Sequence, residues 1–494
     1  MKLSQLLATE LPHDPEISGL SSDSRLVQPG DVFFALSGYQ VQGHGFIHDA
    51  IQKGAVAIVT ERADQPILDA KIPQIYLPNL KNTLGKIAAR FYDFPANELR
   101  IVGVTGTSGK TSCSQFIAAA LHQLKQVCGV IGTLGNGLYG DLQPSAFTTP
   151  DAVSLQKTLK TFVQASAEFV SMEVSSHALD QGRVAGLEFE VGLFTNLSRD
   201  HLDYHGTMAA YGQTKAQLFQ QSRHKILNAE DAFCAELLRS NSLGENVFAI
   251  AIDAHPKDYP SDIEWITVRH IQTTKAGISA DIQTPWGESH ISLKLSGIFN
   301  LMNGLMTLTT LCVLGYSLRD AVMCLEHLQP VAGRMEKFTQ ENQPTVIVDY
   351  AHKPDALEKV LKALRAECAG KLWCVFGCGG ERDKGKRPLM AEIAEQFSDR
   401  VIVTNDNPRS ENADDIVKDI LSGFSDISKV VVQQDRARAI QEAVQSAAAN
   451  DTILIAGKGA ETYQIIGQQE LPFSDIEHVK NALLKGGSNA SLVR

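Results

Sequence analysis

The chain has 494 residues, of which 44% are hydrophobic and 20% are charged, and its formal net charge is −11. This length is too great for one hydrophobic core and predicts about three domains. The acidic balance argues against general binding of nucleic acid, which favours a basic surface. No apolar run approaches the roughly 18 residues that a membrane-spanning helix needs, so no association with a membrane is expected.

Eight cysteines are spread along the chain without a paired framework. They predict reduced thiols in a cytoplasmic protein, because disulfides form in oxidising compartments. Cys374 and Cys378 lack a second Cys or His pair at zinc spacing, so they are not expected to bind zinc. The expected oligomeric state is a monomer.

Residues 1–98 are expected to form a small α/β domain. Apolar, β-branched runs predict strands over Asp31–Leu36 and Ala55–Thr60. The segment between them, 43–54, predicts a helix that ends at glycine. A linker is expected at residues 92–97.

Residues 99–330 alternate between strand and helix patterns, which predicts a parallel sheet with helices on both faces. The first strand is expected at 99–104, and a helical pattern covers 114–122. Residues 262–295 have antiparallel character, with runs at 278–284 and 290–295 on either side of a Pro-Trp-Gly-Glu turn.

The turn after the first central strand is the most informative segment, with the sequence Val104-Thr-Gly-Thr-Ser-Gly-Lys-Thr-Ser112. Strand, glycine-rich turn and helix form the context of a phosphate-binding loop, in which helix N–H groups and the helix dipole attract anions. Lys110 can reach outer phosphates, and the Thr111 hydroxyl can ligate Mg²⁺. The match is imperfect because Val104 occupies the usual first glycine position. A turn that binds nothing is the alternative, and the Lys-Thr pair argues against it.

Three further residues of the central segment are candidate metal or phosphate ligands. Glu173 follows a strand-like run beside the phosphate loop, which is the usual position of a carboxylate that holds nucleotide-bound Mg²⁺. His201 and Lys215 follow farther along. Each has a simpler alternative when taken alone: a helix-start acid, a structural histidine and a solvated lysine.

From residue 331 the strand pattern restarts and predicts a second doubly wound sheet. Five buried strands are expected, at 345–349, 372–376, 400–404, 429–433 and 452–456. Ligands of such sheets bind at the carboxyl ends of the strands, where Arg382 and Arg409 could grip a carboxylate and Glu461 an ammonium group. The alternative for the arginines is pairing with nearby acids such as Asp383 or Glu411.

At this point the chain resembles the Mur ligases over essentially its whole length. Six ordered motifs carry the resemblance: Thr105-Gly-Thr-Ser-Gly-Lys-Thr111, Met172-Glu-Val-Ser-Ser-His177, Thr195-Asn-Leu-Ser-Arg-Asp-His-Leu-Asp-Tyr-His-Gly206, Gly333-Arg-Met-Glu336, Asp349-Tyr-Ala-His352 and Asp406-Asn-Pro-Arg409. The resemblance implies an α/β protein of three domains. These are a small uridine-nucleotide domain (1–98), a central ATPase-like parallel-sheet domain with the phosphate loop (99–330) and a C-terminal Rossmann-like domain that binds the amino acid (331–494).

The activity implied by the resemblance is that of an ATP-dependent amide ligase of peptidoglycan synthesis, with Mg²⁺ as the metal. ATP phosphorylates a free carboxylate of the substrate, and an amine then attacks the acyl phosphate. The motifs are most similar to those of members that add meso-2,6-diaminopimelate to UDP-N-acetylmuramoyl-L-alanyl-D-glutamate.

The resemblance also implies roles for matching positions in the central and C-terminal domains. The expected ATP contacts are Gly106, Thr107, Ser108, Gly109, Lys110, Thr111, Ser112, Asn300, Asn303, Arg334, Asp349 and His352. The expected metal ligands are Thr111, Glu173, His201 and Lys215, with Lys215 carbamylated. The residues expected to carry catalysis are Lys110, Lys215 and His201.

The remaining matching positions are expected to bind the two other substrates. Those for the UDP-linked dipeptide are Ser22, Ser24, Tyr39, Gln40, Val41, Thr148, Thr149, Ser175, Gln181 and Arg183. Those for the amino acid are Arg382, Asp406, Asn407, Pro408, Arg409, Gly457 and Glu461. The sequence departs from the family at Phe147, where some members have a polar residue.

Four alternatives are weighed against this interpretation. A lysine-adding ligase is disfavoured by Arg409, because lysine lacks the carboxylate that this arginine can bind. A ligase for D-alanyl-D-alanine should lack the Asp-Asn-Pro-Arg segment. Folylpolyglutamate synthetases share the architecture, but residues 19–46 fit a uridine-nucleotide domain. A phosphate-loop protein that is not a ligase leaves Glu173, His201 and Lys215 unexplained.

Overall fold

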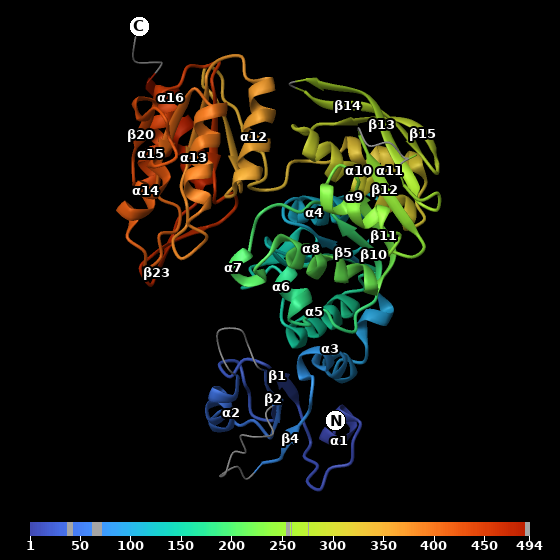
Figure 1. Ribbon diagram of the computed structural model, residues 1–494. Helices are drawn as coiled ribbons and strands as arrows, with labels where there is room; N and C mark the ends of the chain where they lie inside the picture. Colours follow the sequence, from blue (N-terminus) through green and yellow to red (C-terminus); the bar gives the residue numbers. More distant parts are fainter. Residues whose placement is uncertain (37–42, 62–71, 253–256, 258, 275, 490–494) are drawn as a thin grey trace.

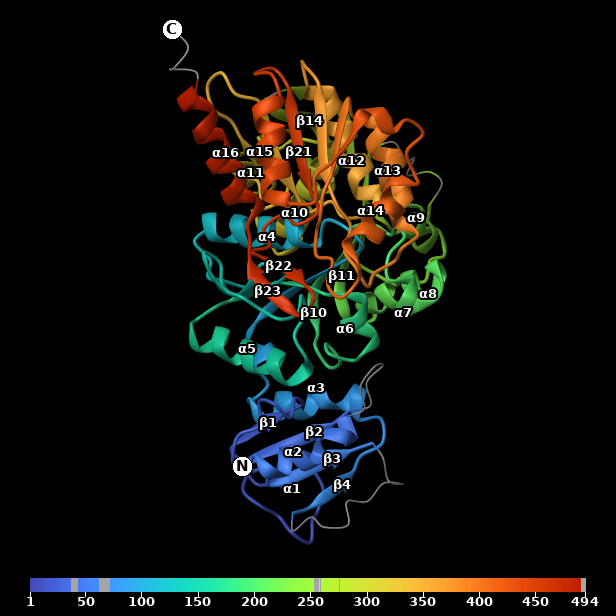
Figure 2. The ribbon, with the colours of Figure 1, turned by 90° about the vertical axis from the view of Figure 1, so that its left-hand side faces the viewer.

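The computed structural model describes residues 1–36, 43–61, 72–252, 257, 259–274 and 276–489. Three α/β units follow one another along the chain, and the N-terminal unit lies at one end of the molecule (Figures 1 and 2). Tyr39, Gln40 and Val41 lie outside the described residues. In the described part of the chain, no helix is long and apolar enough to cross a membrane.

The N-terminal unit is a four-stranded parallel sheet covered by short helices. Its strand order is β1-β2-β3-β4, formed by Gly19–Ser21, Asp31–Ala35, Ala57–Thr60 and Gln74–Tyr76. Its helices are α1 (Leu3–Leu7), α2 (Ile47–Gln52) and α3 (Leu80–Phe91). The helix expected at 43–54 forms in two parts, a 3-10 turn η1 (Gly43–Phe46) and then α2.

The expected linker at 92–97 is a turn that runs into the 3-10 segment η2 (Pro95–Glu98). Helix α3 packs against α5 (Ala152–Gln164) of the central unit, and Ala152 and Val153 belong to the same apolar cluster as Leu80 and Leu84. The first two units therefore share part of a core.

The central unit is built on one sheet of eleven strands, in the order β15-β14-β13-β12-β11-β10-β5-β9-β6-β7-β8. The strands are β5 (Arg100–Thr105), β6 (Cys128–Gly132), β7 (Gly135–Leu138), β8 (Asp141–Gln143), β9 (Phe169–Glu173), β10 (Phe189–Phe194), β11 (Ser222–Asn228), β12 (Val247–Ala251), β13 (Glu264–Thr274), β14 (Gly277–Thr284) and β15 (Gly287–Leu293). The middle of the sheet, from β13 to β6, is parallel as expected.

Both ends of this sheet are antiparallel. The β13–β15 end lies in the segment for which antiparallel character was predicted. The β6–β8 end was not predicted, because β7 has the sequence Gly135-Asn-Gly-Leu138 and lacks the β-branched, alternating pattern of a strand.

Helices cover both faces of the central sheet. They are α4 (Lys110–Gln123), α5, α6 (Ser176–Asp180), α7 (Leu202–His205), α8 (Met208–Ala216), α9 (Ala232–Arg239), α10 (Ile298–Val313) and α11 (Leu318–Glu326), with the 3-10 segment η3 (Gln217–Gln221) after α8. One core contains Phe116 of α4 and Leu305 of α10, and a second contains Leu159 of α5. Helix α4 packs between the sheet and α10, with its amino end at the carboxyl end of β5.

The C-terminal unit contains a six-stranded sheet in the order β16-β17-β21-β18-β19-β20. Its strands are β16 (Glu336–Phe338), β17 (Thr345–Asp349), β18 (Leu372–Phe376), β19 (Arg400–Val403), β20 (Val430–Val432) and β21 (Thr452–Ala456). All five predicted strands are present and parallel, and β16 adds an antiparallel edge.

Two cores, one on each face of this sheet, hold its helices. The helices are α12 (Pro354–Glu367), α13 (Lys386–Phe397), α14 (Ala413–Leu421), α15 (Arg436–Ser446) and α16 (Asp475–Asn489), with a 3-10 turn η5 (Ile427–Lys429). A separate hairpin of β22 (Tyr463–Ile466) and β23 (Gln469–Pro472) follows β21 and was not predicted.

Candidate active site

The segment between β5 and α4 has the geometry of a phosphate-binding loop. Gly106 has φ +139° and Gly109 has φ +84°, conformations that side chains with a Cβ rarely adopt. A Cβ on Gly106 would lie 1.9 Å from Thr195 Oγ1, and one on Gly109 would lie 2.9 Å from Asn303 Oδ1. Glycine is therefore required at both positions, and the loop closes against β10 and α10.

Three lysine ammonium groups meet at the carbonyl groups of this loop. Lys110 Nζ donates to Gly106 O at 2.9 Å and to Thr107 O at 3.2 Å. Lys215 Nζ, from α8, donates to Gly106 O at 2.8 Å and is 1% exposed. Lys353 Nζ, from the C-terminal unit, lies 3.5 Å from Thr107 O. Burial lowers the pKa of Lys110 to about 8 and that of Lys215 well below its usual range, and the neighbouring lysines add to both effects.

Hydroxyl and carboxylate oxygens gather at the start of α4. Thr111 Oγ1 donates to Glu173 Oε2 at 3.0 Å, and Glu173, at the end of β9, is buried. Thr133 donates to the same carboxylate from its backbone N–H at 2.8 Å and from its hydroxyl at 3.3 Å. Oxygen ligands of this kind are those that Mg²⁺ prefers.

The carboxylate that pairs with His201 is Asp200, its neighbour in the sequence. His201 Nε2 is 3.1 Å from Asp200 Oδ2, and the φ of His201 is +50°. Burial lowers the pKa of His201 to about 3. The rings of His201 and Tyr211 are 6.2 Å apart, and Lys215 Nζ lies 4.6 Å from the centre of the same Tyr211 ring. The Tyr211 ring thus lies close to both predicted metal ligands, His201 and Lys215.

The C-terminal unit brings Arg334 and the turn after β17 to the phosphate loop. Arg334 Nη2 donates to Thr111 Oγ1 at 3.0 Å. Asp349 accepts hydrogen bonds from the backbone N–H groups of Met335 (2.7 Å) and Ala351 (2.8 Å), and burial raises its pKa. Burial lowers the pKa of His352, which keeps its ring neutral.

The amide of Asn303 donates to Asn300 Oδ1 at 3.3 Å, within α10. The same Asn303 faces Gly109 of the loop. The predicted ATP contacts on β5–α4, on α10 and in the C-terminal unit are therefore adjacent.

The residues predicted to bind the UDP-linked dipeptide are connected in two groups. Arg183 donates to Thr149 O at 2.9 Å and through two nitrogens to Gln181 Oε1, and its guanidinium lies 5.1 Å from the ring centre of Phe147. Thr149 Oγ1 donates to the Glu173 carbonyl at 2.8 Å and lies 3.4 Å from Ser175 Oγ. This group is thus tied directly to the end of β9.

The second group spans the first two units. Ser22 Oγ donates to Asp151 Oδ1 at 3.0 Å, and the same oxygen accepts the first N–H groups of α5. Ser24 is buried, and its carbonyl accepts from Lys53 Nζ. Thr148 Oγ1 lies 3.2 Å from Thr133 Oγ1, beside the Glu173 carboxylate.

The predicted amino-acid contacts lie at the carboxyl ends of β18, β19 and β21. Arg409, with φ +55°, donates from Nη1 to Gly380 O at 2.9 Å. Arg382 is exposed, and a Cβ on Gly379 would lie between the two arginines. Among the described residues no carboxylate pairs with Arg382 or Arg409, because Glu411 pairs with Arg387 and Lys384 and Asp383 pairs with Arg199.

Glu461 belongs to a buried polar cluster on this edge. Its Oε2 accepts from Lys458 Nζ at 2.8 Å and from Asn407 Nδ2 at 3.1 Å. Asp406 is buried and would lie 2.7 Å from a Cβ on Gly457, whose φ is +121°. Pro408 accepts the backbone N–H of Glu411. One oxygen of Glu461 is thus already paired with an internal cation.

Sequence reasoning missed several residues that support the site. They are Asp200, Lys353, Arg387, Arg436 and Lys458. Asp200 lies inside a motif quoted for the family resemblance, next to His201, and Lys458 follows the predicted contact Gly457, so the position of both was a usable signal. Arg387 and Arg436 lie within helical stretches, where nothing distinguishes them from surface arginines until their burial is known.

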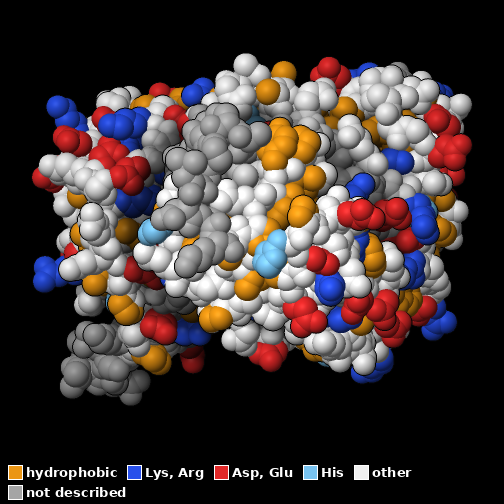
Figure 3. Space-filling model, turned by 90° about the horizontal axis from the view of Figure 1, so that it is seen from below, with side chains coloured by type: hydrophobic (Ala, Val, Ile, Leu, Met, Phe, Trp, Pro, Cys, Tyr) orange, Lys and Arg blue, Asp and Glu red, His pale blue; other side chains and the backbone are white. Residues whose placement is uncertain are grey.

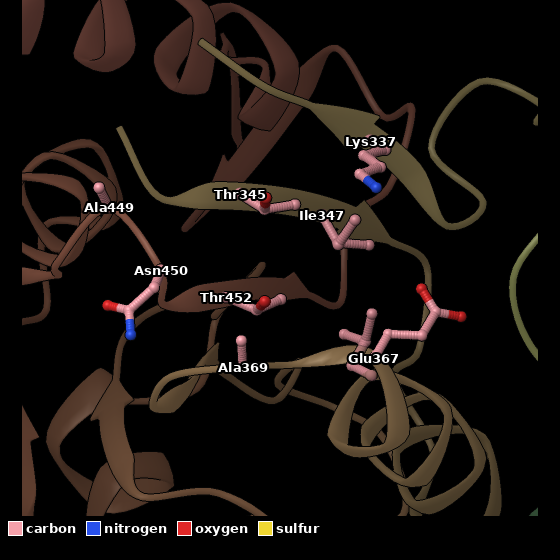
Figure 4. A pocket seen from close by; sticks show the side chains of 9 residues that line it. Lys337, Thr345, Ile347, Glu367, Ala369, Ala449, Asn450 and Thr452 are labelled. Carbon is pink, nitrogen blue, oxygen red and sulfur yellow. The ribbon is translucent and has the colours of Figure 1, made fainter. Parts of the chain in front are cut away.

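A small cavity elsewhere in the C-terminal unit does not belong to this site. It lies at the amino ends of β17 and β21 and is lined by Thr345, Thr452, Glu367, Asn450 and Lys337 (Figure 4). The surface seen from the N-terminal end carries interspersed acidic and basic side chains rather than a basic field (Figure 3).

A phosphate loop on a parallel sheet is approached by a second α/β unit, whose ligand edge has two arginines that pair with no carboxylate of the described residues. This arrangement defines an enzyme that couples a nucleotide to a second substrate. Three family models match the chain: the Mur ligase family catalytic domain at residues 16–92, the Mur ligase middle domain at 104–311 and the Mur ligase glutamate ligase domain at 333–459.

Similar proteins extend over nearly the whole chain. A Coxiella burnetii protein described as UDP-N-acetylmuramoyl-L-alanyl-D-glutamate--2,6-diaminopimelate ligase is 47% identical over 97% of this chain and 99% of its own length. A solved structure of a ligase with the same description has a TM-score of 0.69 and 33% identity, and covers 99% of each chain. The MurF ligase of Thermotoga maritima in complex with ADP shares the fold, with a TM-score of 0.63 and 19% identity over 96% of this chain and 98% of that one.

The chain belongs to the Mur ligase family, and it is an ATP-dependent ligase.

Proposed function

We propose that this protein adds meso-2,6-diaminopimelate to the free carboxylate of UDP-N-acetylmuramoyl-L-alanyl-D-glutamate, with ATP as the energy source. The observation that carries the proposal is the 47% identity to the Coxiella burnetii ligase of that description over 97% of the chain. Two arginines at the C-terminal ligand edge, for which the described residues provide no carboxylate partner, support the same substrate.

The proposed reaction has two steps. The substrate carboxylate attacks the outermost phosphorus of ATP, which gives an acyl phosphate and ADP. The amine of the amino acid then attacks the acyl carbon, and the tetrahedral intermediate expels phosphate and leaves an amide. Negative charge on the transferring phosphoryl oxygens is stabilised by fixed positive groups, a role that fits Lys110 and the N–H groups of the loop.

Mg²⁺ fits the oxygen atoms at the start of α4. Thr111 and Glu173 would hold it together with phosphate oxygens, and the ion would neutralise charge on those oxygens. The described residues contain no group of three or more His, Cys, Asp or Glu side chains placed to hold a metal. A second ion at His201 would therefore depend on an oxygen ligand from another source.

Lys215 suits that role if it is carbamylated. Its lowered pKa favours a neutral amine, which can add CO₂ to form a carbamate and release a proton. The carbamate replaces a buried cation by an oxygen ligand, which would also relieve the repulsion among the lysines.

The geometry at Arg409 favours diaminopimelate over lysine. The two amino acids differ by the carboxylate on the far carbon of diaminopimelate. Arg409 Nη1 donates to two backbone carbonyls, Gly380 O at 2.9 Å and Asn407 O at 3.4 Å, and no carboxylate of the described residues pairs with this guanidinium. A bound lysine would leave this guanidinium without an anion, at a cost of about 1–3 kcal/mol or more.

The proposal is tested by incubating the protein with an equimolar mixture of meso-diaminopimelate and L-lysine, in the presence of ATP, Mg²⁺ and the UDP-linked dipeptide. Mass spectrometry then measures the ratio of the two products. We expect the diaminopimelate product almost alone. Arg409→Ala should lower that preference by about tenfold or more, whereas Arg438→Ala, an exposed arginine on α15, should leave it unchanged. A lysine product from the unaltered chain would reject the substrate, and an unchanged preference in Arg409→Ala would remove Arg409 from the pocket.

A further inference from the structure

Lys353 crosses from the C-terminal unit to the phosphate loop. It precedes Pro354 at the start of α12 and has the extended conformation (φ −133°, ψ 152°) that a following proline favours. Its ammonium group lies 2.5 Å from Asp200 Oδ2 and 3.5 Å from Thr107 O, both in the central unit. The residue is 8% exposed, so this charge is held away from bulk water.

Two lysines meet at the carbonyl of Thr107. Lys110 and Lys353 both contact this oxygen, whereas Lys215, on the carbonyl of Gly106, would carry an anionic carbamate in the function proposed above. Within the described residues, Asp200 is the carboxylate that forms an ion pair with any of the three, and its partner is Lys353. Buried charges of one sign are costly without a counter-charge, so this cluster favours a polyanionic ligand.

We propose that Lys353 is a phosphate-binding residue, supplied by the C-terminal unit to the outermost phosphate of ATP. This inference rests on the ATP site proposed above. Lys353 shares the carbonyl of Thr107 with Lys110, and a lysine at the Lys110 position of a phosphate loop reaches the outer phosphates. The unit that carries Lys353 also carries the proposed amino-acid site. The amine of the bound amino acid must reach the acyl group to which the outermost phosphate is transferred. The C-terminal unit therefore faces that end of the nucleotide.

Asp200 acts in this account as the group that positions Lys353. Its carboxylate is shared between Lys353 and His201, at 2.5 and 3.1 Å. Of the three N–H groups of the ammonium, one serves Asp200 and one lies toward Thr107 O, which leaves one for a phosphate oxygen while both contacts persist.

The alternative role for Lys353 is a structural link between two units. The structure offers a matched control, because Arg199 and Asp383 also join the central and C-terminal units, at 3.5 Å, without touching the loop carbonyls. A purely structural link would affect ATP and ADP alike, whereas a contact to the outermost phosphate affects ATP alone.

The experiment measures binding of ATP and of ADP to the full chain by calorimetry, with Mg²⁺ and without the other substrates. Lys353→Met should weaken ATP binding by on the order of 10- to 100-fold and ADP binding far less. Lys353→Arg, which keeps the charge, should bind ATP with an affinity within a few-fold of that of the unaltered chain. Arg199→Met should bind both ATP and ADP with the affinities of the unaltered chain. If Lys353→Met does not fold, Lys353→Gln takes its place.

Equal weakening of ATP and ADP, or no weakening of either, would overturn the inference. The same holds if Arg199→Met lowers ATP affinity selectively, because domain contact alone would then explain the effect. Failure of the unaltered chain to bind ATP would instead reject the ATP site itself, so the two failures are distinguishable.

Discussion

At the scale of single residues, Phe147 links a departure from the family pattern to the proposed substrate site. Its ring is 55% exposed and packs against the guanidinium of Arg183, 5.1 Å away. Arg183 in turn donates hydrogen bonds to Gln181 Oε1 and to the Thr149 carbonyl. A cation–π contact of this kind is worth about 0.5–1 kcal/mol at exposed sites and about 2 kcal/mol when desolvated.

Phe147→Ala should therefore raise the KM for the UDP-linked dipeptide several-fold and leave the KM for ATP unchanged. Phe147→Tyr keeps the aromatic face and should behave as the unaltered chain. Steady-state kinetics with each substrate varied in turn measure both constants. A normal dipeptide KM in Phe147→Ala would show that Arg183 needs no aromatic support.

Gly109 sets the close approach of the loop to α10. Gly109→Ala should abolish measurable ATP binding, because its Cβ would displace Asn303, and should also cost about 1–2 kcal/mol in backbone strain. Gly244→Ala is the matched control, since Gly244 has φ +70° with open space around it and incurs the strain alone. Calorimetry with ATP and thermal unfolding separate the two effects, and normal ATP binding by Gly109→Ala would contradict the proposed loop geometry.

At the scale of elements, a buried ion pair fixes the strand ends that carry the proposed amino-acid site. Arg436 of α15 and Asp475 of α16 are fully buried in their side chains and 2.7 Å apart. Arg436 also donates to Ala456 O, at the end of β21, at 2.9 Å, and to Asn405 O, just after β19, at 3.4 Å. These ends lead directly into Gly457 and Asp406.

Arg436→Leu should destabilise the protein by about 3–5 kcal/mol, because it leaves the Asp475 carboxylate buried without its cation. Arg438→Leu removes an exposed arginine from the same helix and should change stability by about 0.5 kcal/mol or less. Thermal or urea unfolding compares the two variants. Similar stability of both would mean that Arg436 is not structurally required.

Elements with a regular apolar pattern could be predicted from the sequence, and irregular ones could not. The strand at 345–349 has three buried β-branched residues at its centre, Val346, Ile347 and Val348, and it forms β17 with the expected bounds. The hairpin of β22 and β23 is mostly exposed and polar, so no alternation marks it. The strand, glycine-rich turn and helix at 100–123 were predictable because their signal is local in sequence.

Contacts between units were beyond sequence reasoning for a physical reason. Lys353 and Asp200 are 153 positions apart, and neither lies in a periodic pattern that points to the other. The same is true of Arg334 and Thr111. Only the folded arrangement brings such pairs together.

At the scale of the whole molecule, the three proposed binding regions lie on three units that polar contacts join to one another. The N-terminal unit is joined to the central unit through Ser22 and Asp151, and the C-terminal unit through Lys353 and Asp200. The central unit supplies the phosphate loop between them. This arrangement predicts that the reaction is completed only when ATP, the UDP-linked dipeptide and diaminopimelate are all bound.

The most direct test of the account is phosphate release from ATP with Mg²⁺, measured with the UDP-linked dipeptide and meso-diaminopimelate present together and with each omitted in turn. We predict sustained release with both present and at most a trace when either is missing. Sustained release without the dipeptide, or release that is indifferent to diaminopimelate, would contradict the proposed ligase.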